Sequence, residues 1–331
     1  MNEKVNKALK YLKVSLLSLI PIVNFFYLTN KFYFSGGKCH SKARLDGKTV
    51  IITGSNTGIG KEAALDLASR GARVIITGRD IQKAYRAAEQ IRNETGNQNI
   101  VVEHLDLASF DSIRKFCSKI NSREERIDIL INSAGITLCP QWKTKEGFEM
   151  QFGVNYLGPF LLTNLLLDKI KKSAPSRIIN VASIGYILGK INWEDLNMED
   201  SYSPLGAYCQ SKLGVVLFTR ELARRLKGTN VSVFCLHPGA CPTEVGRYMA
   251  HTYGWKTYLF IGLGYPIGLW VCKNAKEGAQ TIIHCAVEQD IIDLSGSYFK
   301  DCKPAKLLPH GLNDEDAKRL WDLSESLTHL K

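Results

Sequence analysis

The sequence predicts an α/β fold in which a doubly wound parallel sheet of about seven strands is covered by helices on both faces. Two observations predict it. After Gly47, short strand-like runs alternate with helical stretches, and these runs are almost wholly apolar, as parallel strands buried on both faces must be. The predicted strands are Thr49–Thr53, Arg73–Thr77, Ile100–Leu105, Ile127–Asn132, Arg177–Ser183, Val231–Leu236 and Gly296–Phe299. No repeat or low-complexity linker interrupts them, so residues 46–331 are expected to form one domain.

The first 45 residues differ from the rest in charge and hydropathy. Residues 1–48 carry nine Lys or Arg and two acidic residues, a net +7 of the chain's +11, and Val14–Asn30 is a run of 17 residues without a charge. This length lies at the short end for crossing a bilayer, and Pro21 and Asn24 weaken a helix, so a single span and a shallow interfacial insertion both stay open. A cleaved signal peptide is the alternative. Because no A-x-A-like site follows the run, we expect a retained membrane anchor over residues 1–45.

Composition argues against several other classes of protein. The basic residues flank an apolar run rather than a folded face, which is not typical of a nucleic-acid binder. Nine Cys occur without a C-x-x-C pair or a Cys/His cluster, so we expect neither a metal site nor a disulfide framework.

The first predicted strand leads into a glycine-rich turn, and the helix-like stretch KEAALDLASR follows the turn. Glycines let the backbone approach a pyrophosphate, and the N–H groups at the start of a helix can hold it. Three glycines alone are a weak signal, but a position between strand and helix is the context that a Rossmann-type dinucleotide site requires. We therefore expect a dinucleotide to contact Gly54, Ser55, Asn56, Thr57, Gly58, Ile59 and Gly60.

The end of the second strand distinguishes NAD from NADP. An NAD site usually places a carboxylate there to bind the ribose 2′-hydroxyl, whereas a 2′-phosphate needs a cation. Arg79 follows Gly78 at this point, which favours NADP(H) with Arg79 as the phosphate clamp. The alternative is that Asp80 binds the ribose and Arg79 is solvated. Two further strands end in polar or small residues at the ligand-binding edge of the sheet, namely Asp106, Asn132, Ser133, Ala134 and Gly135.

Tyr208 and Lys212 are four residues apart and so share one face of a helix. A free tyrosine, with a pKa of about 10, is a poor acid-base catalyst at neutral pH, and a neighbouring ammonium group lowers that pKa toward the working range. An isolated Y-x-x-x-K is common, so the neighbouring motifs decide whether this pair is catalytic.

The stretches TGSNTGIG, NSAG, GVNYLGPF, NVAS, YCQSK and LHPG, in this order, resemble the motifs of the short-chain dehydrogenase/reductase family over about residues 46 to 304. The resemblance implies that Ser183 hydrogen-bonds the substrate oxygen, that Tyr208 exchanges its proton, and that Lys212 holds the nicotinamide ribose and tunes Tyr208. Asn155 would complete a water-linked proton relay. The match also implies cofactor-site roles for Asp106 at the adenine, Asn132 as a brace of the sheet, and Pro238, Gly239 and Thr243 in the loop on the nicotinamide side.

Longer stretches, among them FEMQFGVNYLG, SAPSRIINVAS, INWEDLN and SGSYFKDCK, resemble the membrane-associated retinol dehydrogenases, particularly the subgroup that uses NADP. Two positions depart from the family pattern. Ser133 replaces the second Asn of N-N-A-G, and Pro159 stands where the subgroup has His. Neither removes a catalytic group, but Pro159 is expected to bend the helix after Asn155.

The segment Tyr253–Val271 is apolar, with Lys256 as its one charged residue. It follows the nicotinamide loop, so we expect it to lie within a substrate lid around residues 244–275 and to favour an apolar substrate delivered from a membrane. Packing as core against the sheet is the alternative. Its length and Pro266 argue against a second membrane span.

The expected function is therefore an NADP(H)-dependent interconversion of an alcohol and an aldehyde or ketone on an apolar substrate, with retinol and retinal first in line. A steroid, an isoprenoid or a lipid-derived aldehyde is the alternative substrate, and an inactive membrane-tethered NADP-binding scaffold is the alternative of another class. The presence of Ser183, Tyr208 and Lys212 argues against the scaffold. The family resemblance suggests the endoplasmic reticulum, with the mitochondrion or lipid droplets as alternatives. A homodimer through the helices of Asn155 and Tyr208 is common in this fold, but no pattern in the sequence measures it.

Overall fold

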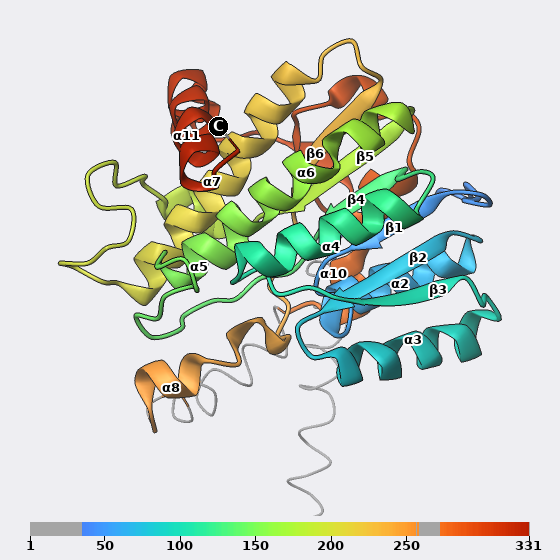
Figure 1. Cartoon of the computed structure of the whole chain (residues 1–331), viewed down its shortest axis with the longest axis horizontal. Coiled ribbons are helices and arrows are strands. Elements are labelled where there is room, and N and C mark those ends of the chain that lie inside the picture. The colour runs from blue at the N-terminus through green and yellow to red at the C-terminus, as the bar shows by residue number, and fades with distance from the viewer. Residues whose placement is uncertain (1–34, 256, 258–271, 331) are drawn as a thin grey trace, which may run out of the picture.

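The central β-sheet positions the predicted site residues, which lie on its strands and on the segments that connect them. A computed structural model describes residues 35–255, 257 and 272–330, and it confirms the doubly wound α/β fold (Figure 1). The sheet has the strand order β3-β2-β1-β4-β5-β6-β7-β8. Its first seven strands are parallel and agree with the predicted ones to within two residues at each end: β1 (Thr49–Ile52), β2 (Arg73–Gly78), β3 (Ile100–His104), β4 (Ile129–Asn132), β5 (Ser176–Val181), β6 (Val231–His237) and β7 (Tyr298–Lys300).

An eighth strand corrects the prediction of about seven parallel strands. β8 (Lys303–Ala305) pairs antiparallel with β7, and Pro304 stands opposite Phe299. The two residues that join these strands, Asp301 and Cys302, have φ angles of 53° and 58°. A two-residue hairpin needs such left-handed angles, but its usual sequence signal is Asn-Gly or Asp-Gly. The pair Asp-Cys therefore did not indicate a turn.

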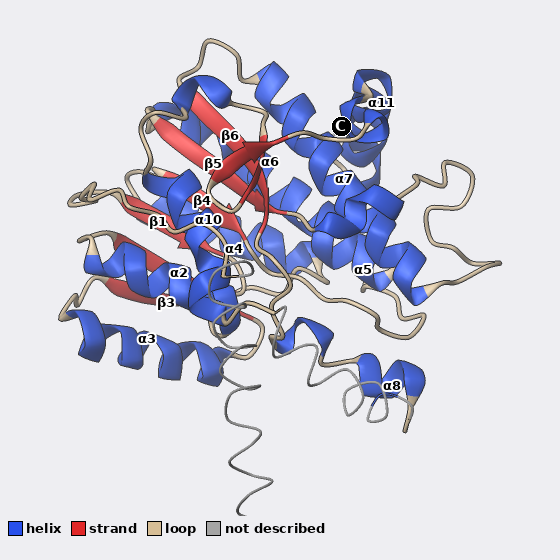
Figure 2. Ribbon diagram, turned by 180° about the vertical axis from the view of Figure 1, so that it is seen from behind, coloured by secondary structure: helices blue, strands red, loops and turns tan. Residues whose placement is uncertain are grey.

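Helices cover both faces of the sheet, as expected from the alternation of strands and helices (Figures 1 and 2). On one face lie α2 (Gly58–Ser69), α3 (Ile81–Thr95) and α10 (Ala275–Val287), and on the other lie α4 (Phe110–Arg123), α6 (Gly158–Lys172) and α7 (Pro204–Arg225). Successive residues of a strand point to opposite faces. In β1, Ile51 joins the core under α4, α6 and α7, while Val50 and Ile52 join the core under α2, α3 and α10.

Short helical turns connect these layers near the ligand-binding edge of the sheet. They are α5 (Met150–Phe152), the π-helical turn η2 (Gly153–Leu157), the 3-10 turns η3 (Ile184–Leu188) and η4 (Glu244–Gly246), and α8 (Met249–Tyr253). Two further 3-10 turns, η5 (Ile292–Leu294) and η6 (Pro309–Leu312), lie in the carboxyl-terminal part of the chain.

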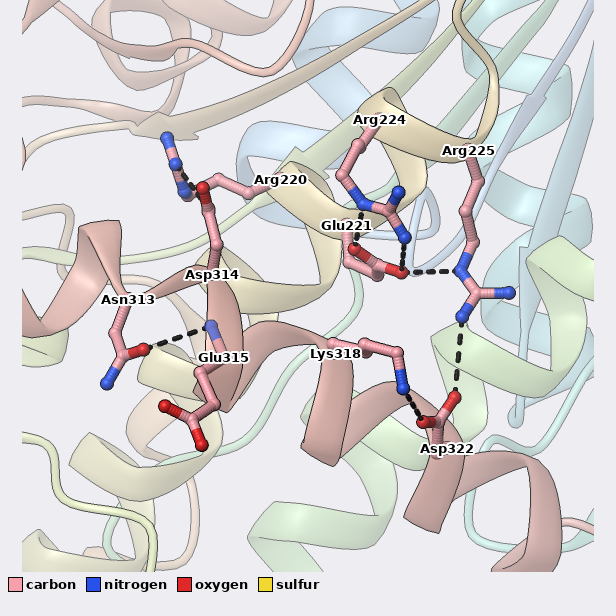
Figure 3. Close-up of polar contacts among 9 residues, drawn as sticks. All are labelled: Arg220, Glu221, Arg224, Arg225, Asn313, Asp314, Glu315, Lys318 and Asp322. Carbon is pink, nitrogen blue, oxygen red and sulfur yellow. Dashed lines mark hydrogen bonds and ion pairs between the residues drawn. The ribbon is translucent and has the colours of Figure 1, made fainter.

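Helix α11 (Asp314–Leu327) packs on α7, the helix that carries Tyr208 and Lys212. Trp321 of α11 is buried, and its ring centroid lies 5.0 Å from that of Phe160 in α6 and 5.8 Å from that of Phe218 in α7. Ion pairs surround this contact: Arg225 pairs with Glu221 and Asp322, and Arg220 pairs with Asp314 (Figure 3). Part of the outer surface of α6 and α7 is thus covered by the chain's own helix, and the homodimer stays a prediction.

The predicted membrane anchor and the apolar segment Tyr253–Val271 fall mostly outside the described residues. Of the anchor over residues 1–45 the structure describes only 35–45, and of the segment Tyr253–Val271 only residues 253–255 and 257. Within the described part of the chain, no helix has both the length and the hydropathy needed to cross a bilayer. Residues 39–45 lie against the catalytic domain: the Cys39 N–H donates to Gln280, and Leu45 joins the core. The division of the chain at residue 45 stays a prediction.

Candidate active site

A cavity of about 680 Å³ opens at the carboxyl ends of the parallel strands, where the strand order reverses between β1 and β4. Ligands of open α/β sheets bind in this crevice. The cavity is lined by every predicted site residue except three, Ser55, Asn132 and Asn155, which lie behind its wall. A second cavity, of about 1300 Å³, lies between α7 and β8 and contains none of the predicted site residues.

The glycine-rich turn has the geometry that dinucleotide binding needs. Gly54 and Gly58 have φ angles of 65° and 58°, and a Cβ on Gly54 would lie 2.8 Å from the Cα of Ala134. Helix α2 begins at Gly58, its N-cap Thr57 makes no side-chain capping bond, and its first turn holds no acidic residue. The N–H groups of this turn are therefore suited to an anionic group such as a pyrophosphate. The Ser55 hydroxyl instead donates to Ile52 O and accepts from Thr77 N, so Ser55 ties the turn to β2 rather than reaching into the cavity.

Two residues hold the floor of the cavity at the end of β4. The Asn132 amide donates to Asn180 Oδ1 at 2.8 Å and to Thr163 Oγ1 at 3.1 Å, so it braces β4 against β5 and α6. Thr53 Oγ1, which the sequence analysis did not single out, accepts from the backbone N–H groups of Ser133 and Ala134. The Ser133 hydroxyl, at one of the two positions that depart from the family pattern, is buried at the cavity wall without a hydrogen-bond partner among the described groups. An unpartnered polar atom at this wall fits a cavity that holds a polar ligand.

The end of β2 carries a cation, and its neighbouring carboxylates are engaged elsewhere. Arg79 is exposed at the cavity mouth, and its Nη2 donates to the Tyr248 hydroxyl at 2.7 Å. Asp80 accepts from Lys83 N and so caps helix α3, and Asp106 accepts from Ala108 N. The capping bond to Asp80 uses Oδ1 alone, so both the clamp by Arg79 and the alternative that Asp80 binds the ribose stay open.

Tyr208, Lys212 and Ser183 meet at the inner end of the cavity. The Lys212 Nζ lies 5.8 Å from the centre of the Tyr208 ring, since both residues project from one face of α7. Ser183 follows β5 as the N-cap residue of η3, and its hydroxyl accepts from Gly185 N at 3.1 Å. A Cβ on Gly185 would lie 3.0 Å from Tyr208 Cε1, so a glycine here lets the phenol lie against the Ser183 turn.

The electrostatics of the pair differ from the sequence prediction. Burial raises the pKa of Tyr208 above its ordinary value, and the Ser183 hydroxyl, not Lys212, is the group that offsets this rise. The Lys212 Nζ donates to the backbone oxygen of Val181 at 2.9 Å, and burial lowers the pKa of Lys212 to about 8. The pKa of Tyr208 is thus raised because desolvation dominates, Lys212 is not among the groups that shift it, and the tuning of Tyr208 by Lys212 stays a prediction.

Asn155 lies in the π-helical turn η2 and is buried. Its side-chain oxygen accepts from Ile136 N, and its amide donates to Ile136 O and to Ser211 Oγ. Pro159 lies in the first turn of α6, where a missing N–H is tolerated, and the expected bend of the helix stays a prediction. Since Pro159 has no N–H, the Asn155 carbonyl cannot form the usual helical bond to the residue four positions later.

His237 is a site residue that the sequence analysis named only within LHPG. It ends β6, it is buried, and its Nδ1 lies 3.3 Å from Ile184 N, the N–H that follows Ser183. Burial lowers the pKa of His237 to about 4, so the ring is neutral at physiological pH and Nδ1 can accept this hydrogen bond. His237 thus supports the turn that presents Ser183.

Residues 48–254 match the model of the short chain dehydrogenase family. The chain belongs to this family. It is 51% identical to human Retinol dehydrogenase 13 over 91% of this chain and 90% of that protein, and 44% identical to human Retinol dehydrogenase 12 over 96% of this chain and 99% of that one. The resemblance to retinol dehydrogenases is thereby confirmed. Family membership makes the chain an oxidoreductase and implies a nicotinamide cofactor.

Solved structures agree with the fold. A crystal structure of an uncharacterised protein from Mycobacterium paratuberculosis superposes with a TM-score of 0.71 at 33% identity, over 89% of this chain and 98% of that one. The Pseudomonas aeruginosa RhlG structure, an active-site complex with NADP, has a TM-score of 0.62 at 24% identity, over 79% of this chain and 97% of that one. At that identity the second likeness shows the fold alone.

Proposed function

We propose that this short-chain dehydrogenase uses NADP(H) to interconvert an alcohol and an aldehyde or ketone on an apolar substrate, with retinol and retinal as the first pair to test. The observation that carries the proposal is the convergence of Ser183, Tyr208 and Lys212 in one cavity whose mouth carries Arg79. The retinol dehydrogenase relatives support the retinoid class.

The phenol of Tyr208 is the proton donor in the reductive direction. Because burial raises its pKa, the phenol is protonated at neutral pH and has a proton to give to the carbonyl oxygen of the substrate. Ser183, which lines the same cavity as Tyr208, holds the same substrate oxygen. When bound, the nicotinamide cofactor supplies the hydride.

Lys212 acts on Tyr208 from one helical turn further along α7. Its ammonium group is held by the Val181 carbonyl at the end of β5, within the cavity wall. In this position it favours negative charge on Tyr208 after the proton has left. Asn155 keeps the loop at Ile136 and the Tyr208 helix in register through its bonds to both, and its own backbone carbonyl is available to the proposed water-linked relay.

The catalytic assignment is tested with purified full-length protein, retinal and NADPH. We expect Tyr208→Phe to lower kcat at least a hundredfold, because the general acid is lost while the ring is kept. Equal activity of the wild type and Tyr208→Phe, or activity in neither, would overturn the enzymatic proposal and favour the inactive scaffold. Running the same assay with steroid ketones, an isoprenoid aldehyde and lipid-derived aldehydes tests the alternative substrates.

A substitution of Arg79 tests the preference for NADP(H) over NAD(H). Arg79→Gln should raise the KM for NADPH more than tenfold and leave the KM for NADH within about twofold, because only the 2′-phosphate loses its cation. A wild type that reduces retinal equally well with NADH and NADPH would contradict the NADP assignment.

We also propose that residues 1–45 anchor the protein to a membrane, that of the endoplasmic reticulum first, and that the region around 244–275 covers an apolar substrate. Deleting residues 1–35 should move the protein from the membrane fraction to the supernatant. An unchanged membrane fraction would contradict the anchor.

A further inference from the structure

The segment after the nicotinamide loop reaches the far end of the cofactor cavity. The Tyr248 hydroxyl accepts the hydrogen bond from Arg79 at 2.7 Å, although the two residues are 169 positions apart in the chain. Tyr248 follows η4 and precedes α8, whereas Arg79 follows β2. The chain therefore links the substrate side of the cavity to the end of β2, where a ribose 2′-substituent is recognised in this fold.

Arg247 brings a second cation to Tyr248. Its guanidinium carbon lies 4.9 Å from the centre of the Tyr248 ring, and its Nη1 donates to the Glu244 backbone oxygen at 2.8 Å. Arg79 and Arg247 both line the cavity. In the described part of the chain neither forms an ion pair with a carboxylate, because Glu244 pairs with Lys83 and Asp80 caps α3.

Other contacts fix the position of this segment. The Tyr248 ring packs edge-on against Trp142, with 5.0 Å between the ring centroids. Thr137 N donates to the backbone oxygen of Val245 at 3.0 Å, and Thr252 Oγ1 donates to that of Leu138 at 2.6 Å. The loop after β4 thus holds the segment from both sides of Tyr248, so the position of Arg247 does not depend on its own solvated side chain.

Two guanidinium groups beside one neutral tyrosine side chain, Arg79 at its hydroxyl and Arg247 over its ring, repel each other, and a bound anion would remove that cost. A phosphate monoester carries between one and two negative charges and offers three acceptor oxygens, which suits two forked donors. The two cations also affect the pKa of Tyr248: burial raises this pKa, but the guanidinium groups of Arg247 and Arg79 outweigh burial and lower it.

We propose that Arg247, positioned by Tyr248, is a second cationic ligand of the 2′-phosphate of NADP, so that the phosphorylated cofactor, and not NAD, engages the segment leading into the substrate lid. The inference rests on the proposed NADP preference, and it adds a residue from the substrate side of the cavity to a recognition site otherwise built on β2.

The test is the binding of adenosine 2′,5′-bisphosphate and adenosine 5′-monophosphate to the full-length protein, measured by calorimetry without substrate or turnover. Arg247→Gln should weaken binding of the bisphosphate at least tenfold and leave the monophosphate within twofold. Tyr248→Phe should weaken the bisphosphate about threefold, because the ring keeps its place against Trp142 while the hydroxyl that Arg79 contacts is lost. The matched control is Arg86→Gln, which removes an exposed arginine from α3 and should change neither affinity more than twofold.

Three results would overturn the inference. They are unchanged bisphosphate binding in Arg247→Gln, an equal loss for both nucleotides, and a loss in Arg86→Gln as large as that in Arg247→Gln. Arg79→Gln separates this inference from the proposed function. If Arg79→Gln loses the preference for the bisphosphate over the monophosphate while Arg247→Gln keeps it, the NADP proposal stands and the proposed role of Arg247 is refuted. A wild type without that preference refutes both.

Discussion

Replacing Lys212 by Met is expected to change the stability of the protein in a pH-dependent way. Compared with the wild type, the variant should be more favoured at neutral pH than at high pH. An unfolded lysine keeps its proton up to a pKa of 10.5, whereas burial lowers the pKa of Lys212 to about 8. That difference corresponds to about 3 kcal/mol of folding free energy lost below pH 8. Between pH 8 and 10.5 the unfolded chain binds more protons than the folded one, so the stability of the wild type rises with pH through this window.

Methionine has similar length and no charge, so Lys212→Met removes this pH dependence. It also removes the hydrogen bond to Val181 O, which costs about 1 to 3 kcal/mol at every pH. The net effect at pH 7 is therefore small or moderately stabilising, but the stability of Lys212→Met relative to the wild type should fall by about 3 kcal/mol between pH 7 and pH 10.5. At high pH the wild type should be the more stable protein, and the variant should be inactive throughout.

Urea denaturation of both proteins at half-unit steps from pH 7 to 10.5 measures this difference. Titration of other groups affects both proteins and cancels. Lys171→Met, which removes an exposed lysine from α6, is the control and should give a flat difference. A flat difference for Lys212→Met as well would refute the reasoning that burial of this ammonium group is costly.

Three further predictions concern the fold and the glycine-rich turn. Trp321→Ala should lower the free energy of unfolding by about 3 to 5 kcal/mol, because a buried ring between α6, α7 and α11 is lost; a loss below about 1 kcal/mol in urea denaturation would contradict this packing. Gly54→Ala should abolish nucleotide binding in calorimetry, whereas Gly96→Ala, with a similar φ of 71° but open space around it, should cost only about 1 kcal/mol and keep binding. For Asp128, burial raises the pKa, but the bonds from Arg126, Thr49 and Lys48 outweigh it and lower the pKa. This stabilisation is present at neutral pH and is lost as the pH falls, so Asp128→Asn should destabilise by about 3 kcal/mol at pH 7 and progressively less below about pH 4 in acid titrations of stability.

The sheet was predictable because each buried parallel strand is an uninterrupted apolar run, and such a run is a local property of the sequence. β8 was not, since Lys303–Ala305 contains Pro304 and follows a turn without glycine. Its pairing depends on β7 being in place, which is a property of the assembled sheet and not of the three residues.

The meeting of Tyr208 and Lys212 was predictable because the two residues are four positions apart on one helix, whereas Ser183 was predicted from the family motifs, and the catalytic roles stay proposals. The protonation of these groups was not predictable, because the pKa of Tyr208 depends on how deeply α7 buries it, and spacing carries no information on burial. The meeting of Arg79 with Tyr248 across 169 residues was equally out of reach. Arg79 and Tyr248 meet because the loop after β4 hydrogen-bonds the segment 244–253 and holds it at the cavity.

The packing of α11 on α7 has a consequence for the order of synthesis. Helix α7 ends at Arg225, but the helix that covers Phe218 begins only at Asp314. At a translation rate of about 5 to 20 residues per second, the aromatic surface around Phe218 and Phe160 waits roughly 5 to 20 seconds on the ribosome before Trp321 can reach it. During that interval the helix that bears Tyr208 exposes an apolar surface that α11 has not yet covered. Chaperones are expected to engage nascent chains at this stage, and a chain terminated before α11 would display that surface permanently.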